Sequence, residues 1–200
     1  MLILNGEEML LAGNSFSVNR TVEILAVFDM RCRFNEFFVL QIQYQRTSVV
    51  SNIRKADLND IPVIVDYRII MFQTFIKETY DWQAIKEFEI NYFQEKMQDN
   101  QFAAWVAEIT DGTIIATAAV SFYETAPKPW NLQSRYAFVS SMYTEPEYRR
   151  QGIGGRLLKK VIDYSRSQGI THATLHASKS GKSLYESFGF EDTNEIRLTL

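Results

Sequence analysis

The segment "MYTEPEYRRQGIGGRLL", residues 142–158, decides the architecture of this chain. It joins a strand-like stretch, residues 135–144, to an amphipathic helix pattern through a glycine-rich turn. Arg149, Gly152 and Gly154 form an R-x-x-G-x-G pattern there. Because glycine has no Cβ atom, main-chain N–H groups can converge on an anion, and the helix start adds unpaired N–H donors and a positive dipole end. The segment therefore predicts a diphosphate site.

Other glycine motifs fit this chain less well. A dinucleotide fingerprint needs a small residue three positions after Gly154, where Leu157 stands, and an acidic residue for the ribose, which "ITHATLH" does not offer. The triplet Gly181-Lys182-Ser183 ends like a nucleotide-binding P-loop, but His176 replaces the first glycine. A structural strand-to-helix turn stays open as the alternative to the phosphate site.

The patterns around this segment predict the fold. From residue 51 onward, hydrophobic periodicity and turn signals predict the order β-α-α-β-β-β-α-β-α-β. Asp57 and Asp81 are expected to cap the first two helices, and the alternation of residues 195–200 predicts a closing strand. This order predicts an α/β fold (an α+β mixed sheet), with a partly parallel central sheet and helices on both faces.

Residues 136–190 resemble the GNAT superfamily of N-acetyltransferases. The opening segment looks like the acetyl-CoA signature of that family, and "LYESFGFE", residues 184–191, looks like its C-terminal block. The element order from Ser51 to Leu200 also resembles the GNAT-like acyl-CoA N-acyltransferase fold. The resemblance implies an enzyme that moves an acetyl group from its co-substrate acetyl-CoA to a primary amine of a small molecule, by direct attack in a ternary complex. A non-catalytic acyl-CoA-binding regulatory domain and a peptide or protein N-acetyltransferase remain alternatives.

The resemblance also implies where the co-substrate binds. Backbone groups of Met142, Tyr143 and Thr144 would bond the pantetheine arm, and a bulge there would splay this strand from the next. The N–H of Met142 would polarise the thioester carbonyl. Tyr185 aligns with the general acid of the family and would protonate the departing sulfur. The diphosphate would be held by Arg149, Arg150, Gln151, Gly152, Ile153, Gly154 and Gly155.

One position departs from the family pattern. Many members have an asparagine seven residues before the tyrosine, where this chain has Ser178. Ser178 would then reach the pantetheine through a water, or that contact is missing. Lys179 and Lys182 are further candidates for contacts with the phosphates of the coenzyme, although exposed lysines are usually only solvated.

The general base and the acceptor site are weaker predictions. An amine must be neutral to attack, so a carboxylate or a water chain has to take its proton. Glu108 and Glu124, on or beside central strands, are the candidates for the base. The acceptor is expected between the first two helices and the loop of residues 125–134. Residues of that region that could hold a cationic or aromatic amine are Tyr80, Asp81, Trp82 and Trp130.

Composition limits the remaining classes. The net charge of −3 disfavours a nucleic-acid partner. The single cysteine excludes an internal disulfide and a cysteine-based zinc site. His172 and His176 would lie about 13 Å apart along a strand, too far to share a metal, so no metal is expected. No apolar run is long enough to span a membrane, and a cytoplasmic location is the default expectation. Whether the chain forms a homodimer stays open.

The resemblance implies that residues 51–200 form the acetyltransferase domain, and we expect residues 1–50 to be an extension without recognisable chemistry. Residues 21–28 and 36–45 have strand-like composition. Since the resemblance begins just after Val50, and a GTG codon can encode valine or start translation, we expect residues 1–49 to be either an upstream reading extension or an addition foreign to the family. The mass of the N-terminus of the native protein distinguishes a start at Met1 from a later one.

Overall fold

The computed structural model describes residues 9–11, 14–16, 50, 52–196 and 198. The chain divides into two units, Met1–Tyr44 and Gln45–Leu200. In the first unit, β1 (Met9–Leu11) and β2 (Asn14–Phe16) pair antiparallel, where no strand was expected. The strands predicted at residues 21–28 and 36–45 lie outside the described residues, and the division of the chain at residue 50 stays a prediction.

The second unit is built on a five-stranded mixed sheet in the order β3-β4-β5-β6-β7. Its first four strands pair antiparallel, and β7 pairs parallel with β6. The predicted mixed α/β sheet is therefore confirmed. The strands are β3 (Asn52–Lys55), β4 (Phe102–Glu108), β5 (Ile114–Glu124), β6 (Arg135–Thr144) and β7 (Ala173–Leu175).

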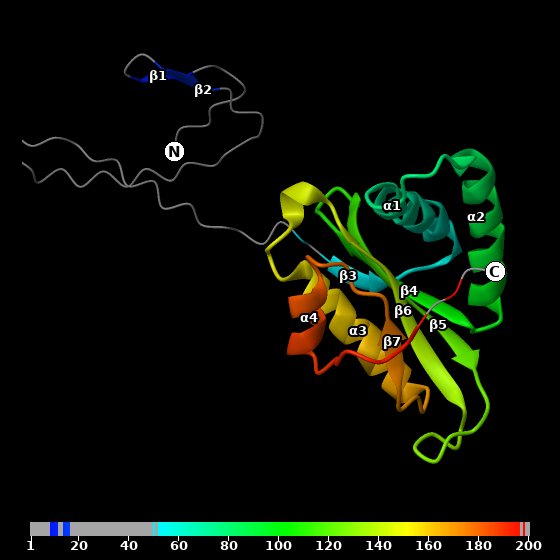
Figure 1. Cartoon of the computed structure of the whole chain (residues 1–200). Coiled ribbons are helices and arrows are strands. Elements are labelled where there is room, and N and C mark those ends of the chain that lie inside the picture. Colours follow the sequence, from blue (N-terminus) through cyan, green and yellow to red (C-terminus); the bar gives the residue numbers. More distant parts are fainter. Residues whose placement is uncertain (1–8, 12–13, 17–49, 51, 197, 199–200) are drawn as a thin grey trace, which may run out of the picture. The chain divides into compact units, whose positions relative to one another are not determined.

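Helices cover both faces of this sheet (Figure 1). On one face lie α1 (Ile61–Gln73) and α2 (Trp82–Gln98). On the other face lie α3 (Ile153–Ser167) and α4 (Lys182–Ser187). Short 3-10 turns, Leu58–Asp60 and Pro146–Tyr148, precede α1 and the turn into α3.

The alternation of β4 explains the two cores. Successive side chains of a strand point to opposite faces, so a strand buried on both sides is apolar throughout. Ala103, Trp105 and Ala107 pack with α3, whereas Phe102, Ala104 and Val106 pack with α1 and α2. Fully buried side chains of α3, such as Leu157 and Leu158, each contribute about 1.5–3 kcal/mol by leaving water.

Polar contacts fix the start of α1 against the sheet. The side chains of Asp57 and Asp60 form a capping box, as an acid at each position suggested. Arg54 of β3 donates to both carboxylate oxygens of Asp60, at 2.6 and 2.8 Å. Asp81 caps α2 by accepting from the N–H of Ala84 at 3.0 Å, as expected. The helix starts are therefore set by local side chains.

The predicted closing strand is not seen. The described residues of that segment, Glu195, Ile196 and Leu198, lie in no strand, and Arg197, Thr199 and Leu200 lie outside the described residues. Ile196 is 93% exposed, and Leu198 is 79% exposed. Alternation produces a strand only where a neighbouring strand supplies hydrogen bonds, and none pairs with the described part of this segment.

Candidate active site

A β-bulge interrupts the pairing of β6 with β5. Thr117 pairs with Tyr143 and Ala119 pairs with Ser140, so Ala118 of β5 faces two residues of β6, Ser141 and Met142. Ser141 has a φ of 50°, in the left-handed region that non-glycine residues rarely occupy. The bulge expected at the end of this strand is present, and its backbone is strained.

Thr117 holds the bulge in place. Its Oγ1 donates to the carbonyl oxygen of Ser141 at 2.8 Å, and both side chains are buried. The Oγ of Ser141 is buried without a hydrogen-bond partner among the described residues. Strain of this kind costs about 1–3 kcal/mol and is concentrated at functional sites.

The extra residue reverses the faces of the strand end. Val139 packs with the α3-side core, and so does Met142 three residues later, whereas a regular strand would reverse its face over an odd number of residues. Tyr143 consequently points to the α1 side, where its ring stacks on that of Tyr67 at 4.7 Å. Burial raises the pKa of Tyr143, and it raises the pKa of Tyr67, whose hydroxyl donates to the carbonyl oxygen of Ile114 at 2.6 Å.

Beyond the bulge, β6 has an unpaired edge. Its parallel pairing with β7 runs from Ala137 to Val139 and stops there. Tyr143 and Thr144 pair with β5 on one side, and Met142 lies in the bulge. None of the three residues pairs with a described strand on the other side. An unpaired strand edge offers main-chain donors and acceptors to an extended ligand. Three of the residues predicted for pantetheine thus lie on an edge suited to that contact.

The predicted diphosphate turn follows this edge directly. Arg149 donates from Nε to the carbonyl oxygen of Thr144 at 2.8 Å, closing the turn onto the strand. Arg150 and Gly152 have positive φ angles of 62° and 75°. The first helical N–H of α3 with an acceptor is that of Arg156, bonded to the carbonyl oxygen of Gly152 at 3.1 Å.

The amides before Arg156 are the donors of the turn. No backbone acceptor among the described residues receives the N–H groups of Gln151 to Gly155, and the N-cap Gly152 supplies no side chain. Ile153 points inward and is buried. Several unpaired N–H groups at a helix start bind a phosphate well.

The glycines in the turn have different roles. A Cβ atom on Gly152 would meet no atom within 4 Å, so only its backbone angle requires glycine. A Cβ atom on Gly154 would lie 3.5 Å from Leu184 of α4, and one on Gly155 would lie 3.6 Å from the same side chain. Both distances are ordinary van der Waals contacts, so the packing of α4 does not by itself require glycine at either position.

Tyr185 is carried by α4 toward the same region. Its ring packs on the α3-side core and meets Phe190 edge-on at 6.0 Å. Burial raises the pKa of Tyr185, so its hydroxyl stays protonated at neutral pH. No described residue supplies that hydroxyl with a hydrogen-bond partner.

Two other predicted coenzyme contacts are engaged within the protein. The Oγ of Ser178 accepts from the N–H of Gly181 at 3.1 Å and lies 3.2 Å from the Oγ of Ser180. Lys182 donates to Asp192 at 2.5 Å, and this pair raises the pKa of the lysine. Both side chains stabilise the turn around α4.

The two candidate bases differ in position. Glu108 accepts from Arg54, with Nε at 2.8 Å and Nη2 at 2.6 Å from its Oε1, so this carboxylate belongs to the network between β3 and β4. Glu124 pairs with Arg135 at the other end of β6, about 20 Å along the strand from the bulge. We assign neither residue as the base.

The residues expected around the acceptor are not brought together. Tyr80 and Trp82 lie at the start of α2, with ring centroids 5.6 Å apart. Trp130 is 66% exposed on the β5–β6 loop. The 17 residues of α2 span about 25 Å, and its end leads to Phe102, which pairs near that loop. Tyr80 to Trp82 and Trp130 therefore lie at opposite ends of the sheet (Figure 1).

An open groove borders β6 and β7 on the α1 side of the sheet. We call it the β6–β7 groove; its volume is about 410 Å³, and it is lined by Tyr123, Phe138, Thr174, Leu175, His176 and Glu195. The hydroxyl of Tyr123 lies 3.2 Å from the Oγ1 of Thr174, and the ring of His176 meets Phe138 edge-on at 5.2 Å. None of these residues was predicted for the acceptor, because they come from separate strands.

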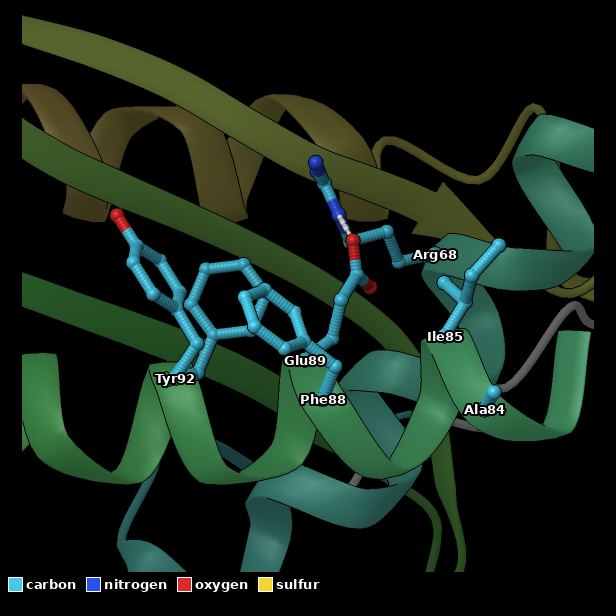
Figure 2. A pocket seen from close by; sticks show the side chains of 7 residues that line it. Arg68, Ala84, Ile85, Phe88, Glu89 and Tyr92 are labelled. Carbon is cyan, nitrogen blue, oxygen red and sulfur yellow. Dashed lines mark hydrogen bonds and ion pairs between the residues drawn. The ribbon is translucent and has the colours of Figure 1, made fainter.

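A second hollow lies between α1 and α2 (Figure 2). Its volume is about 430 Å³. Arg68 of α1 donates from Nε to Oε1 of Glu89 at 2.9 Å, and Phe88 beside them is 72% exposed. It contains none of the residues predicted for acetyl-CoA or the acceptor, and we assign it no function.

In the part of the chain that the structure describes, no group of three or more His, Cys, Asp or Glu side chains is placed to hold a metal ion. Across those same residues, every helix is too short or too polar to span a bilayer.

Known proteins resemble this chain over most of its second unit. A predicted acetyltransferase from Clostridium acetobutylicum, crystallised with acetyl-CoA, is 34% identical with a TM-score of 0.68; the match covers 74% of this chain and 95% of that one. An uncharacterized N-acetyltransferase from Bacillus subtilis is 24% identical over 70% of this chain and 90% of its own length. The thialysine N-epsilon-acetyltransferase of Bos taurus is 33% identical over 66 residues, which are 32% of this chain and only 39% of that protein.

The sequence of residues 69–190 matches the profile of the acetyltransferase (GNAT) family. That range contains the bulge, the predicted diphosphate turn and Tyr185. The profile covers more than half of the chain, and the fold agrees with it from the mixed sheet to α4. The chain therefore belongs to the acetyltransferase (GNAT) family and is an N-acetyltransferase.

Proposed function

We propose that this enzyme transfers the acetyl group of acetyl-CoA to a primary amine of a small molecule, by direct attack in a ternary complex. The observation that carries the proposal is that one segment presents two sets of main-chain groups in succession. The edge of Met142 to Thr144, which pairs with no described strand, is followed after the turn of residues 145–150 by the amides of Gln151 to Gly155, which have no backbone acceptor among the described residues. An extended arm ending in a diphosphate matches that sequence of donors.

Each part of the surface has a distinct binding role. The edge of β6 bonds the amide groups of the pantetheine, as a neighbouring strand would. The amides at the start of α3 hold the diphosphate, and Arg149 and Arg150 add charge. Since the Oγ of Ser178 is engaged in its own turn, a water is the better link from this residue to the pantetheine.

Acetyl-CoA supplies a thioester whose carbonyl carbon is open to attack. The N–H of Met142, which lies in the bulge, stabilises negative charge on the carbonyl oxygen. Tyr185 donates its proton to the departing sulfur. Because burial raises the pKa of Tyr185, this acid keeps its proton at neutral pH.

Two observations support a small acceptor. The thialysine acetyltransferases that align with part of this chain are named for a small amine. The net charge of −3 also suits a cationic acceptor. These observations favour a small cationic amine over a protein N-terminus.

The direct test is release of free coenzyme A thiol when acetyl-CoA is mixed with a panel of small primary amines. We expect amine-dependent release. Thermal stabilisation by coenzyme A without turnover of any amine would instead indicate a regulatory acyl-CoA-binding domain, and acetylation of peptides alone would indicate a protein acetyltransferase.

Tyr185→Phe tests the acid. We expect kcat to fall about 10²-fold while the Kd for acetyl-CoA changes less than twofold, because the ring packing is kept and only the proton is lost. Tyr164→Phe, in a half-buried ring of the same core, is the matched control and should keep full kcat. Equal kcat in the Tyr185 variant and the wild type would remove the acid role.

A further inference from the structure

His176 occupies a particular place in the β6–β7 groove. The parallel register pairs Val139 with Leu175, and pairing ends there. His176 is therefore the first residue of its segment beyond the paired strands, level with Ser140 and one residue before the bulge at Ser141. The groove therefore reaches the level at which the pairing of β6 with β7 stops, two residues before Met142.

The groove has the chemistry to hold an alkylammonium ion. Glu195 supplies a carboxylate, and the faces of Tyr123 and Phe138 supply apolar and cation-attracting surface. The contact of the Tyr123 hydroxyl with Thr174 fixes that ring across the strands. A cationic head with a short aliphatic chain fits a carboxylate between aromatic walls.

We infer that the β6–β7 groove binds the acceptor amine as an alkylammonium ion and that the imidazole of His176 takes its proton. This inference rests on the proposed function and names the class of its acceptor and its base. Glu108 is bonded to Arg54, and Glu124 lies at the far end of β6. Histidine is the side chain whose ordinary pKa suits a base near neutral pH.

The proton balance closes with groups already named. The ammonium gives one proton to His176, and the neutral nitrogen forms the C–N bond. The C–S bond breaks, and the sulfur takes the proton of Tyr185. The second proton of the attacking nitrogen returns to Tyr185 through solvent, and His176 releases its own to water. The net products are the amide, free coenzyme A thiol and one proton.

The two histidines of the chain make a direct binding test. Imidazole proton resonances are assigned with His172→Gln and His176→Gln, and n-butylammonium is titrated into the wild-type enzyme, with n-butanol as the uncharged control. We expect n-butylammonium to shift the His176 resonance and its titration midpoint, and to leave His172 unchanged. Tyr123 and Glu195 are the other titratable groups of the groove. An unmoved His176 resonance, or equal shifts of both histidines, would overturn the inference.

Kinetics tests the base separately. His172 lies four positions earlier in the chain and does not line the groove. Its Nδ1 is 2.9 Å from the Oγ1 of Thr171, and its ring lies 5.8 Å from that of Tyr136. We expect His176→Gln to lower kcat/KM for n-butylamine about 10²-fold at pH 7, and this loss should shrink as the pH rises toward 10, because a growing fraction of the amine is already neutral. His172→Gln should keep the wild-type kcat/KM for n-butylamine. Both variants should bind acetyl-CoA with the wild-type affinity.

If His176→Gln lowers kcat/KM equally at every pH, or does not lower it at all, His176 is not the base. The two proposals fail separately. Suppose that the wild-type enzyme acetylates amines, but n-butylammonium leaves the His176 resonance unmoved and His176→Gln keeps the wild-type kcat/KM. Only this inference then fails. If no amine is acetylated by the wild type, the proposed function fails first.

Discussion

At the residue scale, Gly152 and Gly154 look equivalent in the R-x-x-G-x-G pattern but differ in the structure. Gly152 has a φ of 75° with open space around its Cβ position, whereas Gly154 faces Leu184. The backbone angle of the first position favours glycine, whereas a Cβ atom at the second would make an ordinary van der Waals contact with Leu184. A pattern of letters reports only the missing Cβ atom and not the reason for its absence.

Gly152→Ala is expected to weaken acetyl-CoA binding at least about tenfold, or 1.4 kcal/mol, because the methyl group enters the space beside the proposed diphosphate. Its left-handed angle should also cost about 1 kcal/mol of unfolding free energy. Gly112→Ala is the matched control, since Gly112 has a φ of 84° and equally open surroundings. Urea unfolding should show the same loss of stability in both variants. Titration calorimetry should show weaker acetyl-CoA binding only in Gly152→Ala. Equal affinities would contradict the diphosphate turn.

At the element scale, the strand end of β6 works because one residue is added to it. The bulge turns Tyr143 toward α1 and leaves Met142 beside the parting strands. Thr117 on β5 fixes the Ser141 carbonyl from the neighbouring strand. The alternation of "RYAFVSSMYT" shows a strand, but the position of the bulge depends on this partner.

Thr117→Val should destabilise the fold by about 1–3 kcal/mol, because it keeps the shape but leaves the buried Ser141 carbonyl without its donor. Ser165→Ala is the control. The Ser165 hydroxyl is also buried and also donates to a carbonyl, that of Val161 at 2.8 Å, but that oxygen lies inside α3, where the helix supplies a second donor. Urea unfolding should show a clearly smaller loss for the control. If the two losses are equal, Thr117 does not have a special role at the bulge.

At the scale of the whole acetyltransferase unit, Arg54 joins three elements. Its guanidinium contacts Asp60 at the start of α1 and Glu108 at the end of β4, from its own place on β3. The hydrogen bonds from Arg54 are the main reason that the pKa of Asp60 is lowered. The edge strand and the first helix are thereby tied to the sheet.

A lowered pKa gives the stability a definite pH dependence. A carboxyl with a lower pKa in the folded state stabilises above its unfolded pKa, about 3.9, and loses that contribution as the pH falls through the folded value. The difference in unfolding free energy between wild type and Asp60→Asn should therefore be constant from pH 7 to about pH 5 and shrink below about pH 4.

Asp163→Asn provides the control for this experiment. Asp163 pairs with Lys159 at 2.6 Å on the surface of α3, where solvent screens the charges. Urea unfolding should show little change at any pH for this variant. A difference for Asp60→Asn that persists unchanged at pH 2 would contradict the role of its charge.

Several local features of this fold could be predicted from the sequence alone. The helix starts at Asp57 and Asp81, the apolar alternation of β4 and the glycine turn before α3 depend on residues a few positions apart, so their patterns predict them. The paired motifs around Gly152 and Tyr185 predicted the family to which the chain belongs, because two motifs at a fixed separation are more specific than either one.

The rest depended on tertiary structure. The bulge at Ser141, the ion pair that engages Glu108 and the groove at His176 arise from residues on separate strands whose register is set only when the sheet assembles. The closing strand predicted at residues 195–200 was wrong for its described residues, because alternation needs a partner edge. Contacts within a few residues are encoded by local spacing, whereas contacts across strands depend on the free energy of the whole packed sheet.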